Sequence, residues 1–189
     1  SDNSIKYWVV PAGTYSSGAS IIFGDPTFKI GNTHTIFITP GDFETNDSDV
    51  SLTSDGSDGV HLLFDDGVSG EVWAYISVPY GKYEIENIKV LYKNEHSEAK
   101  QVYLTIFLMR HREGEISAYD ATTDTYATTA NNNYIETITV PSTAYDNLGT
   151  FQENDVLALG IERYGNDEPN DTYDADWKVF GVIIEMKKF

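Results

Sequence analysis

Two apolar stretches near the C-terminus decide the fold: Asp155-Val-Leu-Ala-Leu-Gly-Ile-Glu-Arg-Tyr164 and Trp177-Lys-Val-Phe-Gly-Val-Ile-Ile-Glu-Met186. In the first, large apolar residues alternate with Ala, Gly and Glu, which is the pattern of a half-buried strand. The loop between them, residues 165–176, carries five carboxylates. A buried unpaired carboxylate is very costly, so the loop is expected at an exposed rim. We expect the two stretches to be the closing pair of an antiparallel sandwich.

Further strand patterns, rich in Val, Ile, Thr, Tyr and Phe, run through the rest of the chain. They are Ile5–Val10, Ser20–Phe23, Thr33–Thr39, Val60–Phe64, Glu71–Val78, Glu84–Lys93, Gln101–Arg110 and Tyr134–Val140. Clusters of Gly, Asn, Asp, Ser and Pro separate them, and no segment sustains an apolar period of 3.6 residues. The sequence therefore predicts an all-β protein, an antiparallel jelly-roll-like β-sandwich with an N-terminal strand-bearing section.

Two further segments have distinct patterns. Residues 101–109 are largely apolar at both odd and even positions, which predicts a central strand that is covered on both sides. Ala118–Asn133 is rich in Ser, Thr, Ala, Asp and Asn, which predicts a long surface loop.

The length of 189 residues fits one domain with an arm. We expect residues 1–56 to form N-terminal strands or an arm, within or beside the same domain, and residues 57–189 to form the sandwich. No apolar run approaches the length of about 18 residues that a membrane span needs. The first residues carry neither the basic nor the apolar region of a signal peptide, although such a peptide is removed from mature proteins.

The chain has 30 acidic and 12 basic residues, a net charge of -18, and no cysteine. An acidic field of this size repels phosphates, which argues against nucleic acid as a partner. The absence of cysteine excludes disulfides, cysteine-based zinc sites and thiol catalysis. The simplest interpretation of the charge is solubility, and the alternative is a polyvalent acidic surface or cation binding.

Catalytic motifs are missing from the sequence. The four histidines show no metal-ligand spacing, and the chain has no GxSxG elbow and no glycine-rich phosphate loop. Asp65 with Asp66, or Glu162 with Asp176, could be imagined as an acid/base pair of a glycosidase, but turn and rim carboxylates explain them more simply. We therefore predict that the protein is not an enzyme and that it has no organic cofactor.

Calcium is the one cofactor that the sequence leaves open, because this ion takes six to eight oxygen ligands from carboxylates and carbonyls. The third acidic loop is the strongest candidate among three. Its candidate ligands are Asp167, Asp171, Asp174 and Asp176. No acidic loop of this chain matches the EF-hand pattern.

Aromatic residues make up 13% of the chain, with 13 tyrosines and three tryptophans, a content that suits sugar stacking as well as core packing. Trp8, Trp73 and Trp177 lie in strand patterns, whereas tyrosines such as Tyr80 and Tyr119 lie near turns. Exposed aromatic rings could stack on sugar rings or anchor a protein interface. A secreted carbohydrate-binding β-sandwich, with or without calcium, is therefore the second of two hypotheses.

The first hypothesis comes from a resemblance. The order of a two-faced apolar strand (Val102–Met109), a polar loop, a strand that ends in Arg163, Asp171-Thr172-Tyr173 and a last strand (Val182–Glu185) resembles β-sandwich segments of tailed-phage virion proteins. It covers about residues 60–189. The resemblance implies a non-enzymatic virion surface or tail protein, homo-oligomeric and plausibly trimeric, that contacts other virion proteins and a cell-surface glycan or receptor. It places the protein in the virion, whereas the second hypothesis makes it secreted.

Overall fold

The computed structural model describes residues 33–45, 48–129, 134–167 and 169–188. The strands predicted at Ile5–Val10 and Ser20–Phe23, and Trp8, lie outside these residues. The elements in chain order are β1 (Thr33–Ile38), η1 (Pro40–Asp42), β2 (Val50–Asp55), β3 (Gly59–Phe64), β4 (Ser69–Ser77), β5 (Lys82–Asn94), β6 (Gln101–His111), β7 (Ala118–Ala127), β8 (Tyr134–Pro141), η2 (Ser142–Leu148), β9 (Phe151–Gln152), β10 (Val156–Tyr164) and β11 (Trp177–Lys188).

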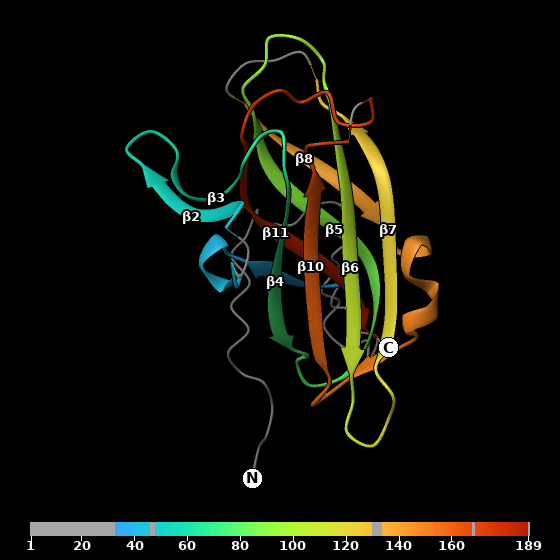
Figure 1. Ribbon diagram of the computed structural model, residues 1–189. Coiled ribbons are helices and arrows are strands. Elements are labelled where there is room, and N and C mark those ends of the chain that lie inside the picture. The colour runs from blue at the N-terminus through green and yellow to red at the C-terminus, as the bar shows by residue number, and fades with distance from the viewer. Residues whose placement is uncertain (1–32, 46–47, 130–133, 168, 189) are drawn as a thin grey trace, which may run out of the picture. The chain divides into compact units, whose positions relative to one another are not determined.

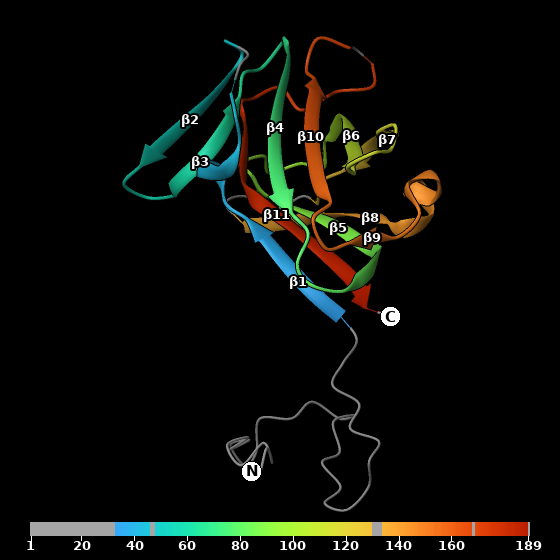
Figure 2. The same cartoon turned by 90° about the horizontal axis from the view of Figure 1, so that it is seen from below.

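Two antiparallel sheets pack face to face (Figures 1 and 2). The larger sheet has the order β2-β3-β11-β5-β8, with β1 also paired to β11 and β9 paired to β5. The smaller sheet has the order β4-β10-β6-β7 and faces the viewer in Figure 1. The predicted all-β, jelly-roll-like antiparallel sandwich is confirmed.

The core lies between the sheets, and the period of two residues in each strand decides which side chains enter it. In β6, Val102, Leu104, Ile106 and Leu108 are fully buried. The larger sheet contributes Ile88 and Val90 from β5 and Val182 and Ile184 from β11, all likewise without exposed surface. These residues belong to one contiguous apolar cluster.

Three expectations of detail were wrong. β10 and β11 are not paired, because β10 lies between β4 and β6 while β11 lies between β3 and β5, so the acidic loop crosses from one sheet to the other. Ala118–Asn133 is not a long loop, since β7 occupies Ala118–Ala127 and pairs with β6 over ten register positions. Its Thr and Ala residues suit an edge strand, which needs only one apolar face.

The third correction concerns β6. Its odd-numbered residues Tyr103, Phe107 and Met109 keep partial exposure, so this strand is central in its sheet but is not covered on both sides. We call the side of the smaller sheet that carries these residues the outer face.

The N-terminal part of the described chain belongs to the larger sheet. β1 pairs with β11, and β2 forms a hairpin with β3 whose turn, at residues 55–59, contains the predicted boundary at residue 56. The boundary itself stays a prediction. Among the described residues, no helix has the length and apolarity needed to cross a membrane.

The two faces of β6 predict different costs of truncation. Leu108→Ala should lower the free energy of unfolding by about 2–5 kcal/mol, because it leaves a cavity in the core. Met109→Ala, its neighbour on the outer face, should cost less than about 1 kcal/mol. Urea unfolding of both variants measures the difference. Equal costs would mean that both faces of β6 are buried.

Candidate functional site

The outer face of the smaller sheet holds an ordered grid of side chains, because four antiparallel strands bring matching residues into rows. Register pairs Trp73 with Gly160, Gly160 with Phe107 and Phe107 with Ala121, so one residue from each strand lies in what we call the aromatic row. A second row, which we call the polar row, lies two residues away along each strand from the aromatic row. It consists of Glu71, Glu162, Thr105 and Thr123. The two rows are separated by roughly 7 Å along the strands.

The Trp73 indole extends over Gly160 of the neighbouring strand in the aromatic row. A side-chain carbon at Gly160 would lie 2.9 Å from two atoms of the indole ring, so only glycine leaves room for it. The Trp73 and Phe107 ring centroids are 5.5 Å apart with an angle of 29° between the planes, and Phe107 and Tyr119 are 6.2 Å apart at 30°. The Trp73 Nε1–H donates to Glu71 Oε1, which holds the indole in place.

Two exposed tyrosines lie at the two ends of the next row, on the side of the aromatic row away from the polar row. Tyr75 on β4 is 57% exposed and Tyr119 on β7 is 49% exposed. Three interstrand spacings separate β4 from β7, roughly 14 Å. The aromatic surface is therefore long enough to contact more than one ring of an oligosaccharide.

Hydrogen bonds connect the polar row to Tyr164. Its hydroxyl donates to Glu162 Oε2 at 2.5 Å, and Thr105 Oγ1 donates to that hydroxyl at 3.3 Å. The Thr105 and Thr123 hydroxyl oxygens lie 2.7 Å apart. Burial and the hydrogen bond to Glu162 raise the pKa of Tyr164, so its phenol stays protonated.

Sequence reasoning found part of this face. Tyr119 was among the candidate tyrosines and Trp73 was assigned to a strand, but Phe107 was predicted to be covered. Of the other aromatic residues, Tyr80 is exposed in the turn between β4 and β5, whereas Tyr173 and Trp177 are buried in the core cluster. Along β4, the aromatic residues Trp73 and Tyr75 alternate with the small apolar residues Val72 and Ala74. This alternation is the sequence signal that separates the outer face from the core face.

The acidic loop is folded around a buried ion pair. Arg163 follows Leu157, Leu159 and Ile161 on the inner face of β10 and has no exposed surface. Its Nε and Nη2 lie 3.1 and 3.2 Å from the carboxylate oxygens of Asp171, and its Nη1 donates to the Ala175 carbonyl at 2.9 Å. The loop is therefore not merely an exposed rim, since Asp171 is 4% exposed.

Backbone donors complete the environment of Asp171. The N–H groups of Tyr103 and Tyr173 donate to its two carboxylate oxygens at 3.2 and 3.0 Å. Tyr173 then reaches the larger sheet, where its hydroxyl donates to the Lys93 carbonyl at 3.1 Å. One ion pair thus joins β10, β6 and β5.

The side chains of three of the four predicted calcium ligands have separate partners. Asp171 pairs with Arg163, Asp174 lies 3.1 Å from Lys100 Nζ, and Asp176 accepts the Asp66 N–H at 3.0 Å. Asp167 accepts the backbone N–H groups of Asn170 and Asp171 through its carbonyl. In the described part of the chain no three His, Asp or Glu side chains converge as a metal site. The carboxylates imagined as an acid/base pair are engaged as well, Glu162 with Tyr164 and Asp176 with Asp66.

The buried ion pair predicts a large effect on stability. Arg163→Met should lower the free energy of unfolding by about 3–5 kcal/mol, because it leaves the Asp171 carboxylate buried without its cation. The matched control is Lys89→Met, which breaks the more exposed pair with Glu185 and should cost at most about 1 kcal/mol. Urea unfolding at pH 7 compares the two. Similar small losses would contradict a structural role for Arg163.

Calcium binding by the acidic loop stays a prediction, which thermal melting tests. A site formed by these carboxylates would raise the Tm as calcium rises through the millimolar range, by mass action. A Tm that is unchanged between EDTA and millimolar calcium would remove the metal hypothesis.

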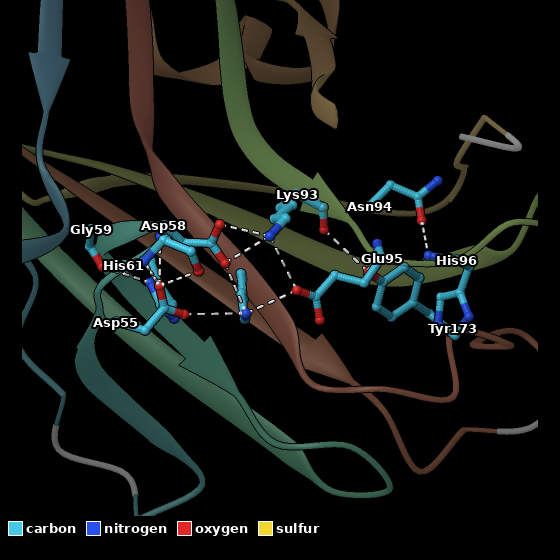
Figure 3. A network of polar contacts seen from close by, with 11 residues as sticks. Asp55, Asp58, Gly59, His61, Lys93, Asn94, Glu95, His96 and Tyr173 are labelled. Carbon is cyan, nitrogen blue, oxygen red and sulfur yellow. Dashed lines mark hydrogen bonds and ion pairs between the residues drawn. The ribbon is translucent and has the colours of Figure 1, made fainter. Parts of the chain in front are cut away.

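A second charged cluster lies at the surface of the larger sheet. Lys93 Nζ contacts both carboxylate oxygens of Asp58, at 2.6 and 2.7 Å, and Lys178 Nζ contacts Asp58 and Glu95 at 3.0 and 2.8 Å. Figure 3 follows this network from Asp55 through Asp58 and Lys93 to Glu95. Hydrogen bonds from Lys93 and Lys178 lower the pKa of Asp58. Lys93 and Lys178 both pair with carboxylates beside the larger sheet, so we attribute a structural role to this cluster.

Several carboxylates predict loss of stability in acid. For Asp155, burial alone would raise the pKa, but hydrogen bonds from Arg112 and the Gln152 N–H outweigh it and lower the pKa below the ordinary 3.8. For Glu136, hydrogen bonds from Thr129 and Tyr92 likewise outweigh burial and lower the pKa below 4.5. The unfolded chain therefore binds more protons at acidic pH, and stability present above the ordinary pKa values falls as pH drops through the lowered ones.

Urea midpoints at pH 7, 5, 4 and 3 measure this dependence. We expect a steady decline below about pH 5, and a shallower decline in Asp155→Asn, which lacks one of the titrating groups. A midpoint that does not change down to pH 3 would contradict the assignment.

Comparison with known proteins gives similarity of fold alone. No protein-family profile and no curated protein sequence match the chain. A family 35 carbohydrate-binding module from Paenibacillus barcinonensis is 13% identical, with a TM-score of 0.46 over 80% of this chain and 97% of that chain. A family 35 module from Clostridium thermocellum is 10% identical, with a TM-score of 0.44 and the same coverages, 80% and 97%.

A third similar structure is the CBM36-1 domain of a multidomain xylanase from the hindgut metagenome of Trinervitermes trinervoides. It is 9% identical, with a TM-score of 0.42 over 80% of this chain and 96% of that chain.

The first functional hypothesis is corrected at this point. The prediction of a virion surface or tail protein is contradicted, because the similar solved structures are carbohydrate-binding modules and not phage proteins. The predicted virion partners and virion location are withdrawn with it. The sandwich that prompted the hypothesis is real, but a sandwich hosts many functions. Homo-oligomerisation stays a prediction.

Proposed function

We propose that this protein is a non-catalytic carbohydrate-binding β-sandwich that holds a glycan against the outer face of its smaller sheet. The aromatic row carries the proposal. The Trp73 and Phe107 rings pack 5.5 Å apart with 29° between their planes on this face, and sugar rings have apolar C–H faces that pack against aromatic rings. A module of this type would act outside the cell, where such glycans are exposed.

Neighbouring groups support the same role. A site for sugars needs a few placed polar groups beside its apolar surface, because hydroxyls that lose water must regain hydrogen bonds. Glu71 and Thr123 of the polar row lie next to the aromatic row and retain exposure. The site sits on paired strands instead of flexible loops, which keeps the rings in fixed positions and limits the entropy lost on binding.

Removal of the Trp73 ring tests the proposal. A glycan array identifies ligands of the wild-type protein, and titration calorimetry then compares variants on the best of them. Trp73→Ala should weaken binding about tenfold or more, because covering a large apolar side chain is worth about 1.5–3 kcal/mol and a factor of ten is about 1.4 kcal/mol.

Tyr80→Ala is the matched control, since Tyr80 is 77% exposed but lies in the turn between β4 and β5. Binding by this variant should equal that of the wild type. Wild-type protein that binds no glycan, or equal losses in the two variants, would overturn the proposal.

A further inference from the structure

The β2–β3 hairpin carries an apolar surface at the edge of the larger sheet. Figures 1 and 2 show the hairpin at one end of that sheet, with β2 as its outermost strand. At the start of β2, Val50 is 3% exposed and its side chain lies against Gly70 of β4. Farther along the hairpin, Leu52 is 48% exposed and Val60 is 53% exposed. The cover that the smaller sheet gives to the hairpin therefore ends before these two residues.

Leu52 and Val60 lie on the side of the hairpin that faces the core. Leu52 is directly opposite Leu62, which has no exposed surface, and residues directly opposite in an antiparallel pair point to the same side of the sheet. Val60 is two residues from Leu62 along β3, so it points to that side as well. The open surface is thus a continuation of the hydrophobic core.

The outer edge of β2 carries backbone groups that are available to a further strand. The Asp65 N–H donates to the Asp49 C=O at 3.0 Å, so these two residues form a hydrogen-bonded pair in line with the β2–β3 register. Bonded pairs alternate with pairs that are not bonded to each other, so the odd-numbered residues of β2 are the ones that bond to β3. Leu52 and Ser54 turn their N–H and C=O groups the other way, to the edge that no described strand pairs with.

Two other edge strands of the sandwich are blocked by the chain itself. On β7, the N–H groups of Ala121 and Thr125 donate to the carboxylates of the aspartates that precede them, at 3.0 and 2.7 Å. On β4, Trp73 exchanges two backbone hydrogen bonds with Glu44. Natural proteins block exposed edges in such ways because an open edge is a template for another strand. Neither arrangement is present at Leu52 and Ser54 in the described part of the chain.

We propose that β2 is a site of self-association, at which two copies of this chain pair their β2 strands antiparallel about a twofold axis. Such a contact presents the same surface from both copies and joins the two larger sheets into one. In the pairing centred on Thr53, each Leu52 forms a hydrogen-bonded pair with Ser54 of the second copy. Ser54 pairs with Val60 in its own hairpin, so Leu52 of one copy covers the small serine and reaches Val60 of the other. The exposed apolar residues of both copies are then buried together.

The charges of β2 permit a second copy at this edge. Like charges directly opposite each other destabilise a pair of strands. β2 is uncharged from Val50 to Ser54, and Asp55 would stand opposite Ser51 of the second copy. Asp55 also has partners in its own chain, since it accepts the Ser57 N–H at 3.1 Å and lies 3.5 Å from Lys178 Nζ. The strand therefore meets its own copy without like charges opposite each other in the paired segment.

A single introduced cysteine tests the register, because the chain has no cysteine of its own. Thr53 would lie opposite Thr53 of the second copy in a pair that is not hydrogen-bonded, with roughly 4.5 Å between the Cα atoms. Thr53→Cys should therefore form a disulfide-linked dimer under mild oxidation, since disulfides span about 4.4–6.8 Å between Cα atoms. Leu52→Cys is the matched control, because its Cα atoms would be roughly 7–8 Å apart, which is too far. Gel electrophoresis without reductant measures the linked fraction.

Sedimentation of the full chain tests the association itself. Wild-type protein should dimerise with a Kd that is micromolar or weaker, because one short strand pair buries less than the roughly 1,200 Å² of a standard interface. Leu52→Lys should weaken the dimer at least about tenfold, because two leucines leave the interface and two charges would have to lose water. Ile116→Lys is the matched control, since Ile116 is 96% exposed in the loop between β6 and β7, and it should leave the Kd unchanged. Circular dichroism confirms that each variant is folded.

Three results would overturn the inference. The first is wild-type protein that stays monomeric at millimolar concentration, as expected if β2 receives a strand of another protein. The second is a dimer that Leu52→Lys leaves intact, which would place the contact on another surface. The third is cross-linking of Leu52→Cys to the same extent as Thr53→Cys, which would exclude the pairing centred on Thr53. Carbohydrate binding is tested separately, because the aromatic row lies in the smaller sheet and the proposed contact uses the edge of the larger one.

Discussion

The buried pair of Arg163 and Asp171 is the constraint on which the rest of the structure depends. Arg163 stands on the core face of β10, where an unpaired charge would be intolerable, so the loop from β10 to β11 must bring a carboxylate to it. By doing so the loop crosses from the smaller sheet to the larger one and places Trp177 at the start of β11, in the core. The loop that brings Asp171 to Arg163 is therefore the same loop that connects the two sheets. The ion pair explains only part of the acidic composition of the loop, because Asp171 is the one carboxylate of the loop that pairs with Arg163.

The strand patterns predicted most of the fold because each strand alternates in one dimension, which sequence reports directly. The stretch from Asp155 to Tyr164 was predicted as a strand, and β10 runs from Val156 to Tyr164. What failed were properties that depend on neighbours in space. The sequence of β10 alone could not predict that it pairs with β4 and β6, because its apolar alternation is compatible with any apolar neighbouring strand. The residues of β7 were predicted to form a loop because they include few large apolar side chains. An edge strand with one solvent-exposed face needs few such residues. A clue to the ion pair was present, since alternation puts Arg163 on the face of Leu157, Leu159 and Ile161.

The candidate site was less predictable than the fold, because a row across four strands draws its residues from distant positions. Trp73, Phe107 and Gly160 become neighbours only through two registers. Gly160 carried no signal in the sequence, yet its missing side chain is what lets the Trp73 indole lie on the sheet. The rule that a strand with two apolar faces is covered on both sides failed for β6, since an aromatic face can also be kept partly open to receive a ligand. The Trp73 ring is held by Glu71 in the free protein, so the proposed glycan binding would cost this side chain little conformational freedom.

The distribution of charge links stability to recognition. Bases are scarce in this chain, 12 against 30 acids, and several of the described ones are partners of buried or partly buried carboxylates. Arg163 neutralises Asp171, Arg112 neutralises Asp155, and Lys93 with Lys178 neutralises Asp58. Using cations in this way leaves the outer face of the smaller sheet with acids and aromatic rings. The ion pairs that hold the two sheets together therefore also decide which charges remain on the face proposed to bind a glycan.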